Sequence, residues 1–270
     1  MFLLMIHQVT PYLSFGLASA LFLFWLAKRL NPLAFDRPNG RRLTRLLVMA
    51  AFIGFQLISW RYGYFFRDPE RAIPQGSTIV SPADGFVVYV RSVKRNEVPL
   101  AVKDGAPIRL EEILKMDSPL SEGILIGIFM TPMSVHVNRA PMDGVIERRV
   151  YFNGTPMRSM MPMALRTMFA RRPFERGSQH LLQNERETLL IRGKQFPVVL
   201  TRIADPYVDK IVLWKKEGET VLRGERIGLI KMGSQADLMM PPRVNGRPVH
   251  VQVKEGQYVY AGSTVLATFE

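Results

Sequence analysis

The sequence predicts a mainly β protein with a few helices, in which pseudo-symmetric barrel sheets follow an N-terminal apolar helical membrane anchor. Three observations lead to this prediction. From Ile73 onward, short apolar runs are punctuated by glycine and proline, which is typical of strands joined by turns. A short motif occurs twice in the C-terminal part of the chain. The first 60 residues are rich in apolar side chains, as expected of a membrane-associated segment.

Residues 1–60 are expected to form the anchor, and residues 61–270 a separate domain. Residues 11–27 are a dense apolar run at the lower length limit for a spanning helix, and the fifteen residues from Leu46 to Trp60 are expected to be too short to span comfortably. Six basic residues between the two runs indicate a cytoplasmic loop. We therefore expect the runs to lie in or dip into the inner leaflet of the cell membrane. The second domain is then cytoplasmic, and a crossing segment stays the alternative.

The charge balance points to an anionic partner. Lysine and arginine total 36 against 23 acidic residues, which gives a net charge of +13. Such an excess suits nucleic acid or an anionic membrane surface. No nucleic-acid-binding motif with interleaved aromatic residues is present, so we expect the membrane surface and no nucleic acid. The absence of cysteine excludes disulfides, thiolate zinc sites and a cysteine nucleophile.

Several strands can be placed from the pattern alone. Residues 79–80 and 86–90 are predicted to be two strands around the turn Pro82–Gly85, and Gly123–Met130 has the pattern of a buried strand. Residues 145–150 follow the turn signal Asp143-Gly144. The segment 157–176 is rich in methionine and arginine with broken helical periodicity. That segment is either a solvated face or a membrane-contacting lid, because adaptable apolar side chains beside cations suit the headgroup level.

The repeated motif indicates internal symmetry. Glu217–Gly224 matches Glu255–Gly262 at an offset of 38 residues (255 minus 217), and a fainter echo relates Pro82–Gly85 to Pro141–Gly144. Two copies suggest a pseudo-symmetric barrel and not a solenoid. The motif resembles the half-motif of a biotinyl/lipoyl-like flattened barrel.

The chain's most informative stretch runs from Arg226 to Leu238. An apolar strand pattern through Ile230 breaks at Met232-Gly233-Ser234. Because glycine lacks the Cβ that blocks unusual backbone angles, Gly233 can let the Ser234 hydroxyl approach the preceding carbonyl. This geometry permits attack of a serine on its own upstream peptide bond. Gly-Ser is also one of the commonest turn dipeptides, so the two residues alone favour a plain turn.

Met232-Gly233-Ser234 resembles the Leu/Met-Gly-Ser cleavage motif of the phosphatidylserine decarboxylase proenzymes. Four upstream blocks occur in that family's order: Phe65-Phe66-Arg67-Asp68-Pro69-Glu70-Arg71, Ser81-Pro82-Ala83-Asp84-Gly85, Met133-Ser134-Val135-His136-Val137-Asn138-Arg139-Ala140-Pro141 and Asn184-Glu185-Arg186. The resemblance covers about residues 61–270 and makes that domain catalytic. It implies self-cleavage at Gly233-Ser234 into a β chain of residues 1–233 and an α chain of residues 234–270. The two products would form a heterodimer, with further oligomerisation left open.

The resemblance also implies the chemistry. Ser234 would become a pyruvoyl group, the cofactor for converting phosphatidylserine into phosphatidylethanolamine without a metal. His136 would be the base that activates Ser234, and Asp84 would orient His136. Asp143 is assigned only a turn role. Further candidates for substrate binding or support are Asn138, Arg139 and Glu185. Some members of the family carry a second histidine where this chain has Arg139, so the division of base work is left open.

A carrier domain is the alternative. Ile230-Lys231-Met232 resembles the Met-Lys-Met tip that bears biotin, so Lys231 would be the modified residue of a biotinyl/lipoyl-type carrier or membrane adaptor. A carrier domain is far smaller than this chain and leaves the four upstream blocks unexplained. The adaptor class requires long coiled-coil heptads, and the sequence has none.

Overall fold

The computed structural model describes residues 16–25, 29, 38–102, 106–155, 157–206, 211–231 and 233–270. The chain divides into two units, one ending at Arg67 and the other running from Asp68 to Glu270. Much of the predicted apolar run 11–27, and Met232 of the cleavage motif, lie outside the described residues.

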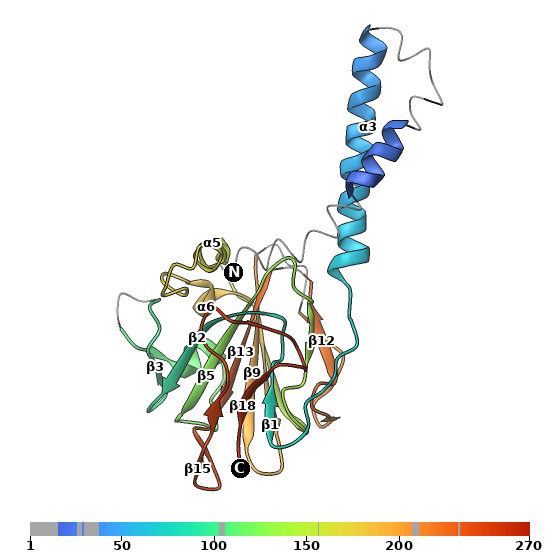
Figure 1. Ribbon diagram of the computed structural model, residues 1–270. Helices are drawn as coiled ribbons and strands as arrows, with labels where there is room; N and C mark the ends of the chain where they lie inside the picture. Colours follow the sequence, from blue (N-terminus) through green and yellow to red (C-terminus); the bar gives the residue numbers. More distant parts are fainter. Residues whose placement is uncertain are drawn as a thin grey trace. The chain divides into compact units, whose positions relative to one another are not determined.

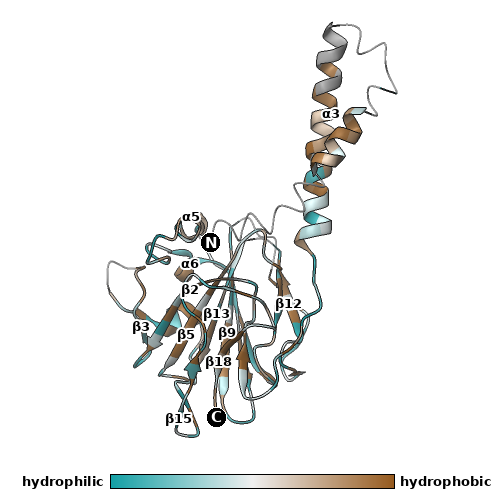
Figure 2. Ribbon diagram, viewed as in Figure 1, coloured by the Kyte–Doolittle hydropathy of each residue, from teal (hydrophilic) through white to brown (hydrophobic). Residues whose placement is uncertain are grey.

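The first unit is helical. It contains a short apolar helix, Gly16–Trp25, and the helix α3, Pro38–Ile58, which continues into the π-helical segment η1, Ser59–Phe65. Apolar residues predominate along the second half of α3 (Figure 2). The stretch Leu46–Phe65 has 20 residues and is long and apolar enough to cross a membrane by length and composition. The expectation of a run too short to span is thus corrected, because the helix does not end at Trp60.

The second unit is mainly β, as predicted (Figure 1). Its largest sheet curls and has eight strands in the order β11-β7-β8-β9-β13-β5-β2-β17, each antiparallel to its neighbours. In chain order these strands are β2 Gly85–Val93, β5 Gly123–Met130, β7 Gly144–Phe152, β8 Arg186–Arg192, β9 Pro197–Ala204, β11 Thr220–Val221, β13 Ser234–Met240 and β17 Tyr258–Val259.

Two three-stranded sheets complete the scaffold, in the orders β1-β18-β16 and β10-β12-β6. Their strands are β1 Thr78–Val80, β6 Val137–Arg139, β10 Ile211–Leu213, β12 Arg226–Ile230, β16 His250–Val251 and β18 Val265–Thr268. Two small strand pairs and three short helices are added: β3 Glu97–Val98 with β4 Ile108–Arg109, β14 Arg243–Val244 with β15 Arg247–Pro248, α4 Leu110–Leu114, α5 Met161–Met168 and α6 His180–Gln183.

The internal repeat is visible in the hydrogen bonds. The backbone N–H of Ala261 donates to Oδ1 of Asp84 at 2.7 Å, and the backbone N–H of Arg223 donates to Oδ1 of Asp143 at 2.8 Å. Ala261 and Arg223 are separated by the repeat's own offset of 38 positions (261 minus 223). In the same way β17 pairs with β2, and β11 pairs with β7. The predicted pseudo-symmetry therefore extends to matching loops around Asp84 and Asp143.

The predicted strands are largely confirmed. The strand predicted at 123–130 coincides with β5. The strands on either side of Pro82–Gly85 also form, but they enter different sheets: β1 pairs with β18, and β2 with β5 and β17. The separation has a physical reason, because the backbone between them is bonded elsewhere. The Ser81 carbonyl accepts from Gly262 N at 2.8 Å, and the Pro82 carbonyl accepts from Arg139 N at 2.9 Å.

Strand β13 lies between β5 and β9 and is buried on both faces. Ala236, Leu238 and Met240 belong to one hydrophobic core and Met239 to a second. By strand alternation Ser234 faces the first core, and Gln235 faces the second. The residue that opens this strand therefore lies in the interior of the domain.

Candidate active site

Ser234 is the first residue of β13 and is fully buried. Its strand partners are Met130 on β5 and Ala204 on β9, and its hydroxyl lies 3.1 Å from the Met130 sulfur. The sequence had suggested that a strand ends in this Gly-Ser pair. Instead β12 ends at Ile230, and Ser234 begins the next strand, in the larger sheet. Ser234 is therefore not part of an exposed turn.

Gly233 is held in a left-handed conformation that favours glycine. Its φ is +41°, and a Cβ built on it would lie 3.1 Å from Cβ and 3.2 Å from Oδ2 of Asp205. The Gly233 carbonyl accepts a hydrogen bond from the Asp205 backbone N–H at 3.0 Å. This carbonyl belongs to the Gly233–Ser234 peptide bond. The donor therefore polarises the very group that a Ser234 nucleophile would attack.

Asp205 was not identified from the sequence. Its backbone N–H is the relevant donor, and every residue type except proline carries one. Its carboxyl is half-buried, with Oδ2 3.4 Å from the Met160 backbone N–H, and burial raises the pKa of this group. Asp205 thus connects the Gly233–Ser234 bond to the residue that precedes α5.

His136 lies in the connection between β5 and β6 and is buried. Its Nδ1 is 2.9 Å from the Ser134 carbonyl. Because a carbonyl only accepts, Nδ1 carries the proton, and Nε2 is the basic nitrogen of the neutral ring. The His136 carbonyl accepts from the Ile230 backbone N–H at 3.2 Å, which places this histidine beside the end of β12.

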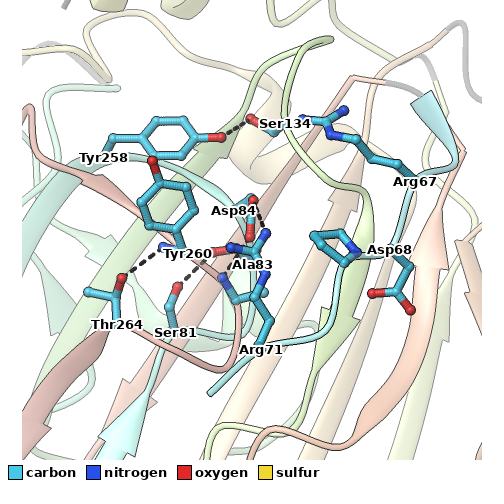
Figure 3. Close-up of polar contacts among 12 residues, drawn as sticks. Arg67, Asp68, Arg71, Ser81, Ala83, Asp84, Ser134, Tyr258, Tyr260 and Thr264 are labelled. Atoms are coloured by element: carbon cyan, nitrogen blue, oxygen red, sulfur yellow. Dashed lines mark hydrogen bonds and ion pairs between the residues drawn. The ribbon is translucent and has the colours of Figure 1, made fainter. Parts of the chain in front are cut away.

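The Ser134 side chain supports the same turn. Its hydroxyl is 3.1 Å from the Tyr258 hydroxyl (Figure 3) and accepts from the Thr131 backbone N–H at 3.1 Å. The position of the His136 ring is therefore fixed by a short turn that is itself bonded to β17. Ser134 belongs to the block that contains His136, but sequence analysis assigned it no role, because it contacts His136 through a main-chain carbonyl.

Asp84 is also buried and lies in the loop before β2. Its Oδ2 accepts from Arg71 at 2.9 Å and its Oδ1 from the Ala261 backbone N–H (Figure 3). The bond between the Pro82 carbonyl and Arg139 N joins this loop to β6, the strand that follows His136. The structure thus brings the Asp84 loop and the His136 segment side by side. The symmetry-related Asp143 is exposed.

Asn138, in strand β6 after His136, shares a contact with Ser234. Its Nδ2 is 3.8 Å from the Met130 sulfur that the Ser234 hydroxyl also contacts. Its Oδ1 is 3.4 Å from Nη1 of Arg202, a fully buried arginine paired with the equally buried Glu187. Burial lowers the pKa of Arg202 to about 9. Asn138 therefore lies between the buried Arg202–Glu187 ion pair and Met130, the residue that the Ser234 hydroxyl contacts.

Arg139 has a supporting position. It is buried and donates to the Asp68 carboxylate at 2.8 Å and to the Gly224 carbonyl at 3.0 Å. It thereby ties the block around Asp68 to the turn of the first repeat. A buried arginine paired in this way fixes the positions of its two partners.

Glu185 accepts a hydrogen bond from the exposed Tyr151 and lies at the periphery. Its two neighbours are the buried members of that block. Asn184 donates to the carbonyl of Ala204, the β9 partner of Ser234, at 2.8 Å. Arg186 donates to four main-chain carbonyls. The Glu185 backbone carbonyl also accepts from the Ala204 N–H at 2.9 Å, so both residues of this block reach the strand partner of Ser234.

A second polar cluster lies on the opposite face of β13. Gln235 donates to Asp237 at 2.6 Å and to the Tyr89 hydroxyl at 2.9 Å, and its oxygen lies 3.2 Å from Nε2 of His180. Burial raises the pKa of Asp237 to about 6 and lowers that of His180 to about 4. Buried polar groups of this kind stabilise one arrangement of a strand when they are satisfied.

The Asp237 carboxyl should make stability depend on pH. Its folded pKa lies above the ordinary value of 3.8, so the folded state binds the proton more tightly. The stabilisation is complete below pH 4 and is lost as pH rises through 6, a change of about 3 kcal/mol. In Asp237→Asn this change should disappear. Urea unfolding of the detergent-solubilised chain from pH 3 to pH 8 measures it. If the free energy of unfolding changed with pH in the same way in both proteins, Asp237 would not be the group responsible. The contribution of His180 is present in both proteins and cancels in the comparison.

Comparison with known proteins identifies the family. The family model described as phosphatidylserine decarboxylase matches residues 58–267. A putative archaetidylserine decarboxylase proenzyme of Methanocaldococcus jannaschii is 35% identical over 206 residues, 76% of this chain and 87% of that protein. The phosphatidylserine decarboxylase proenzyme of Erythrobacter litoralis is 34% identical over 244 residues, 85% of this chain and 86% of its own.

A third relative agrees with these two. The phosphatidylserine decarboxylase proenzyme of Chlorobium limicola is 32% identical over 207 residues, 76% of this chain and 78% of that protein. These matches give no support to a carrier or adaptor modified at Lys231. The chain belongs to the phosphatidylserine decarboxylase family of carboxy-lyases.

Proposed function

We propose that this protein converts phosphatidylserine into phosphatidylethanolamine with a pyruvoyl group that it makes from its own Ser234. The carrying observation is the Gly233–Ser234 bond itself: a buried serine follows a left-handed glycine whose carbonyl is already hydrogen-bonded. A side chain at position 233 would meet Asp205. The site therefore fits the precursor of a pyruvoyl group at the first residue of β13.

Self-cleavage would begin with attack of the Ser234 oxygen on the Gly233 carbonyl carbon. The hydroxyl proton leaves to a base, the carbon–nitrogen bond breaks, and the nitrogen takes up a proton, which leaves an ester. Loss of the Ser234 α-proton then breaks the bond between Cβ and the ester oxygen, and Gly233 is released as a carboxylate. Water replaces the remaining nitrogen as ammonia. The products are a β chain of residues 1–233 and an α chain of residues 234–270, which stay together as a heterodimer.

The base in this scheme is His136. The Ser134 carbonyl keeps the proton on Nδ1, which leaves Nε2 to accept the serine proton. Asp84 is the proposed orienting acid, acting from the loop that is bonded to β6, the strand that follows His136. The Asp205 N–H stabilises the negative charge that develops on the Gly233 oxygen.

Decarboxylation would use the same residues. The pyruvoyl carbonyl supplies a partner for the substrate amine and an acceptor for the electron pair left by departing CO2. The chain itself must then deliver a proton to the substrate carbon, a task for His136 or for water beside it. Asn138 is placed to orient a polar group near position 234, since both contact the Met130 sulfur.

The lipid substrate implies an anionic membrane surface as partner. The net charge of +13 and the apolar helix Leu46–Phe65 suit a chain that works on a bilayer. We place the catalytic domain on the cytoplasmic side, with Leu46–Phe65 dipping into the inner leaflet without crossing it, because the basic residues between positions 28 and 45 favour the cytoplasmic face. The repeat-related pairing of β2 with β17 and of β7 with β11 supports a biotinyl/lipoyl-like barrel as the scaffold.

Intact-mass spectrometry and a lipid assay test the proposal. The purified protein should consist of chains of 233 and 37 residues (270 minus 233), the shorter beginning with a pyruvoyl group. It should release CO2 from phosphatidylserine vesicles. If the protein released CO2 only from archaetidylserine, the proposed substrate would be wrong, and the proposed pyruvoyl chemistry would stand. A full-length chain carrying biotin or lipoate on Lys231 would overturn both the proposed substrate and the proposed chemistry.

The two symmetry-related aspartates provide a matched prediction. Asp84→Asn should slow self-cleavage by about a hundredfold, because orienting carboxylates beside a catalytic histidine contribute on this scale or more. Asp143→Asn should cleave at the normal rate, although it has the same repeat-related hydrogen bond to a backbone N–H. Cleavage is followed by gel electrophoresis during cell-free synthesis. Equal rates for the two variants would show that Asp84 also has only a turn role.

A further inference from the structure

Helix α5, Met161–Met168, has an apolar face that the rest of the domain leaves exposed. Met161, Leu165 and Phe169 are 59%, 45% and 59% exposed. Their spacing of four residues places them in one stripe along the helix and its C-cap. The opposite face, with Met160 and Met163, is buried. The inner face already packs α5 against the domain, so the exposed outer stripe is not needed for that packing.

Positive charge surrounds the stripe. Arg158, Arg171 and Arg172 are exposed, Arg166 is half-buried, and the sequence has no acidic residue from 157 to 174. Within the described residues, no carboxylate pairs with Arg166 or Arg171. A cavity of about 320 Å³ is lined by Pro162, Leu165, Arg166, Phe169 and Arg171. Apolar walls beside two guanidinium groups match a phosphate attached to a hydrocarbon chain.

The segment that leads into α5 is hydrogen-bonded to residues that neighbour the strands on either side of Ser234. The Met160 N–H lies 3.4 Å from the Asp205 carboxylate, and Asp205 contacts Gly233. The Arg158 N–H donates at 2.6 Å to Asn184, which in turn bonds Ala204. Both routes end at residues beside Ser234. The segment before α5 is therefore linked by hydrogen bonds to residues that flank Ser234.

We propose that the face formed by Met161, Leu165, Phe169, Arg166 and Arg171 docks on an anionic bilayer and holds the headgroup region next to the active site. The apolar side chains enter the boundary between headgroups and acyl chains, and the arginines bind lipid phosphates. A bilayer fits better than a protein partner. A single eight-residue helix offers much less surface than the roughly 1,000 Å² a specific protein interface needs. This inference rests on the proposed lipid substrate, but its test does not require turnover.

The full chain contains no cysteine, so a single label can be placed on it. Leu165→Cys carries an environment-sensitive fluorophore, and the protein is reconstituted in phosphatidylcholine vesicles with or without 30 mol% phosphatidylglycerol. In anionic vesicles the label should shift to the blue and be quenched by doxyl-labelled lipid, and added salt should weaken both effects. Leu222→Cys is the matched control, because Leu222 is 63% exposed but follows β11. Its label should stay accessible to aqueous iodide.

The arginines have their own test. Arg166→Gln combined with Arg171→Gln should raise the apparent KM for phosphatidylserine vesicles about tenfold. The variant's self-cleavage should be unchanged. Equal iodide quenching at 165 and 222 in anionic vesicles would overturn the docking surface, and so would an unchanged KM. Docking is also read on the uncleaved Ser234→Ala chain. If α5 docks there while the wild type makes no phosphatidylethanolamine, the proposed function fails and the docking surface stands.

Discussion

Ser234→Ala is expected to remain a single chain of 270 residues with no decarboxylase activity. Alanine has no oxygen to attack the Gly233 carbonyl and cannot become a pyruvoyl group, so both self-cleavage and turnover should be lost completely. The substitution removes one hydroxyl whose recorded contact is the Met130 sulfur. A weak contact of that kind adds little stability, so the variant should fold and melt close to the wild type. Gel electrophoresis, intact mass and CO2 release measure the outcome.

The control for this variant is Ser263→Ala. Ser263 is half-buried in the turn before β18, and its replacement should leave cleavage at position 234 and activity intact. Cleavage of Ser234→Ala into fragments of the expected size would mean that another group performs the attack. Uncleaved Ser234→Ala with normal activity would contradict the pyruvoyl mechanism itself.

Sequence patterns predicted residues whose proposed roles depend on the residue type at that position. Gly233, Ser234, His136 and Asp84 each belong to a block whose order in the chain is informative, and each is found at a buried or conformationally restricted position. Strand β5 could be placed because its apolar run is bounded by glycine and by the polar segment after Met130. Such signals are local and survive without knowledge of the fold.

Residues that act through the backbone left no such signal. Ser134 fixes the His136 tautomer with a carbonyl, and Asp205 contacts Gly233 with an N–H. Any residue but proline offers both groups, so composition and spacing carry no information about them. The buried pair Glu187 and Arg202 was missed for another reason: the register of the hairpin formed by β8 and β9, which sets these two residues opposite each other, was not predicted. The arginine within the apolar strand β9 was the one available hint.

The pseudo-symmetric scaffold also supports the proposal that only one repeat takes part in the chemistry. Asp84 and Asp143 occupy matching loops, but a bond between Pro82 and Arg139 joins the Asp84 loop to the strand that follows His136. Asp143 remains at an exposed turn. The fold thus provides Asp84 as the proposed site aspartate and Asp143 as a matched reference in the other repeat. Differences between variants at these two positions report on chemistry more than on folding.

Asp205→Pro should slow self-cleavage by about a hundredfold, whereas Asp205→Ala should cleave at nearly the wild-type rate. Proline removes the N–H that donates to the Gly233 oxygen at 3.0 Å. Loss of one donor to a developing oxyanion costs a factor of about 10² to 10³. Alanine removes the carboxyl but keeps the N–H. Cleavage rates are measured during cell-free synthesis, and thermal melting of each variant in a Ser234→Ala background establishes that the precursor folds.

The pair of variants separates the backbone from the side chain at position 205. Slow cleavage in Asp205→Ala as well would assign the effect to the carboxyl, whose pKa burial raises. Equal and rapid cleavage in both would show that the Gly233 oxygen needs no donor from this loop. If Asp205→Pro does not fold, infrared spectra of the Ser234→Ala precursor labelled with ¹³C at the Gly233 carbonyl provide the second measurement. A carbonyl stretch as high as that of an unbonded peptide would overturn the role of this hydrogen bond.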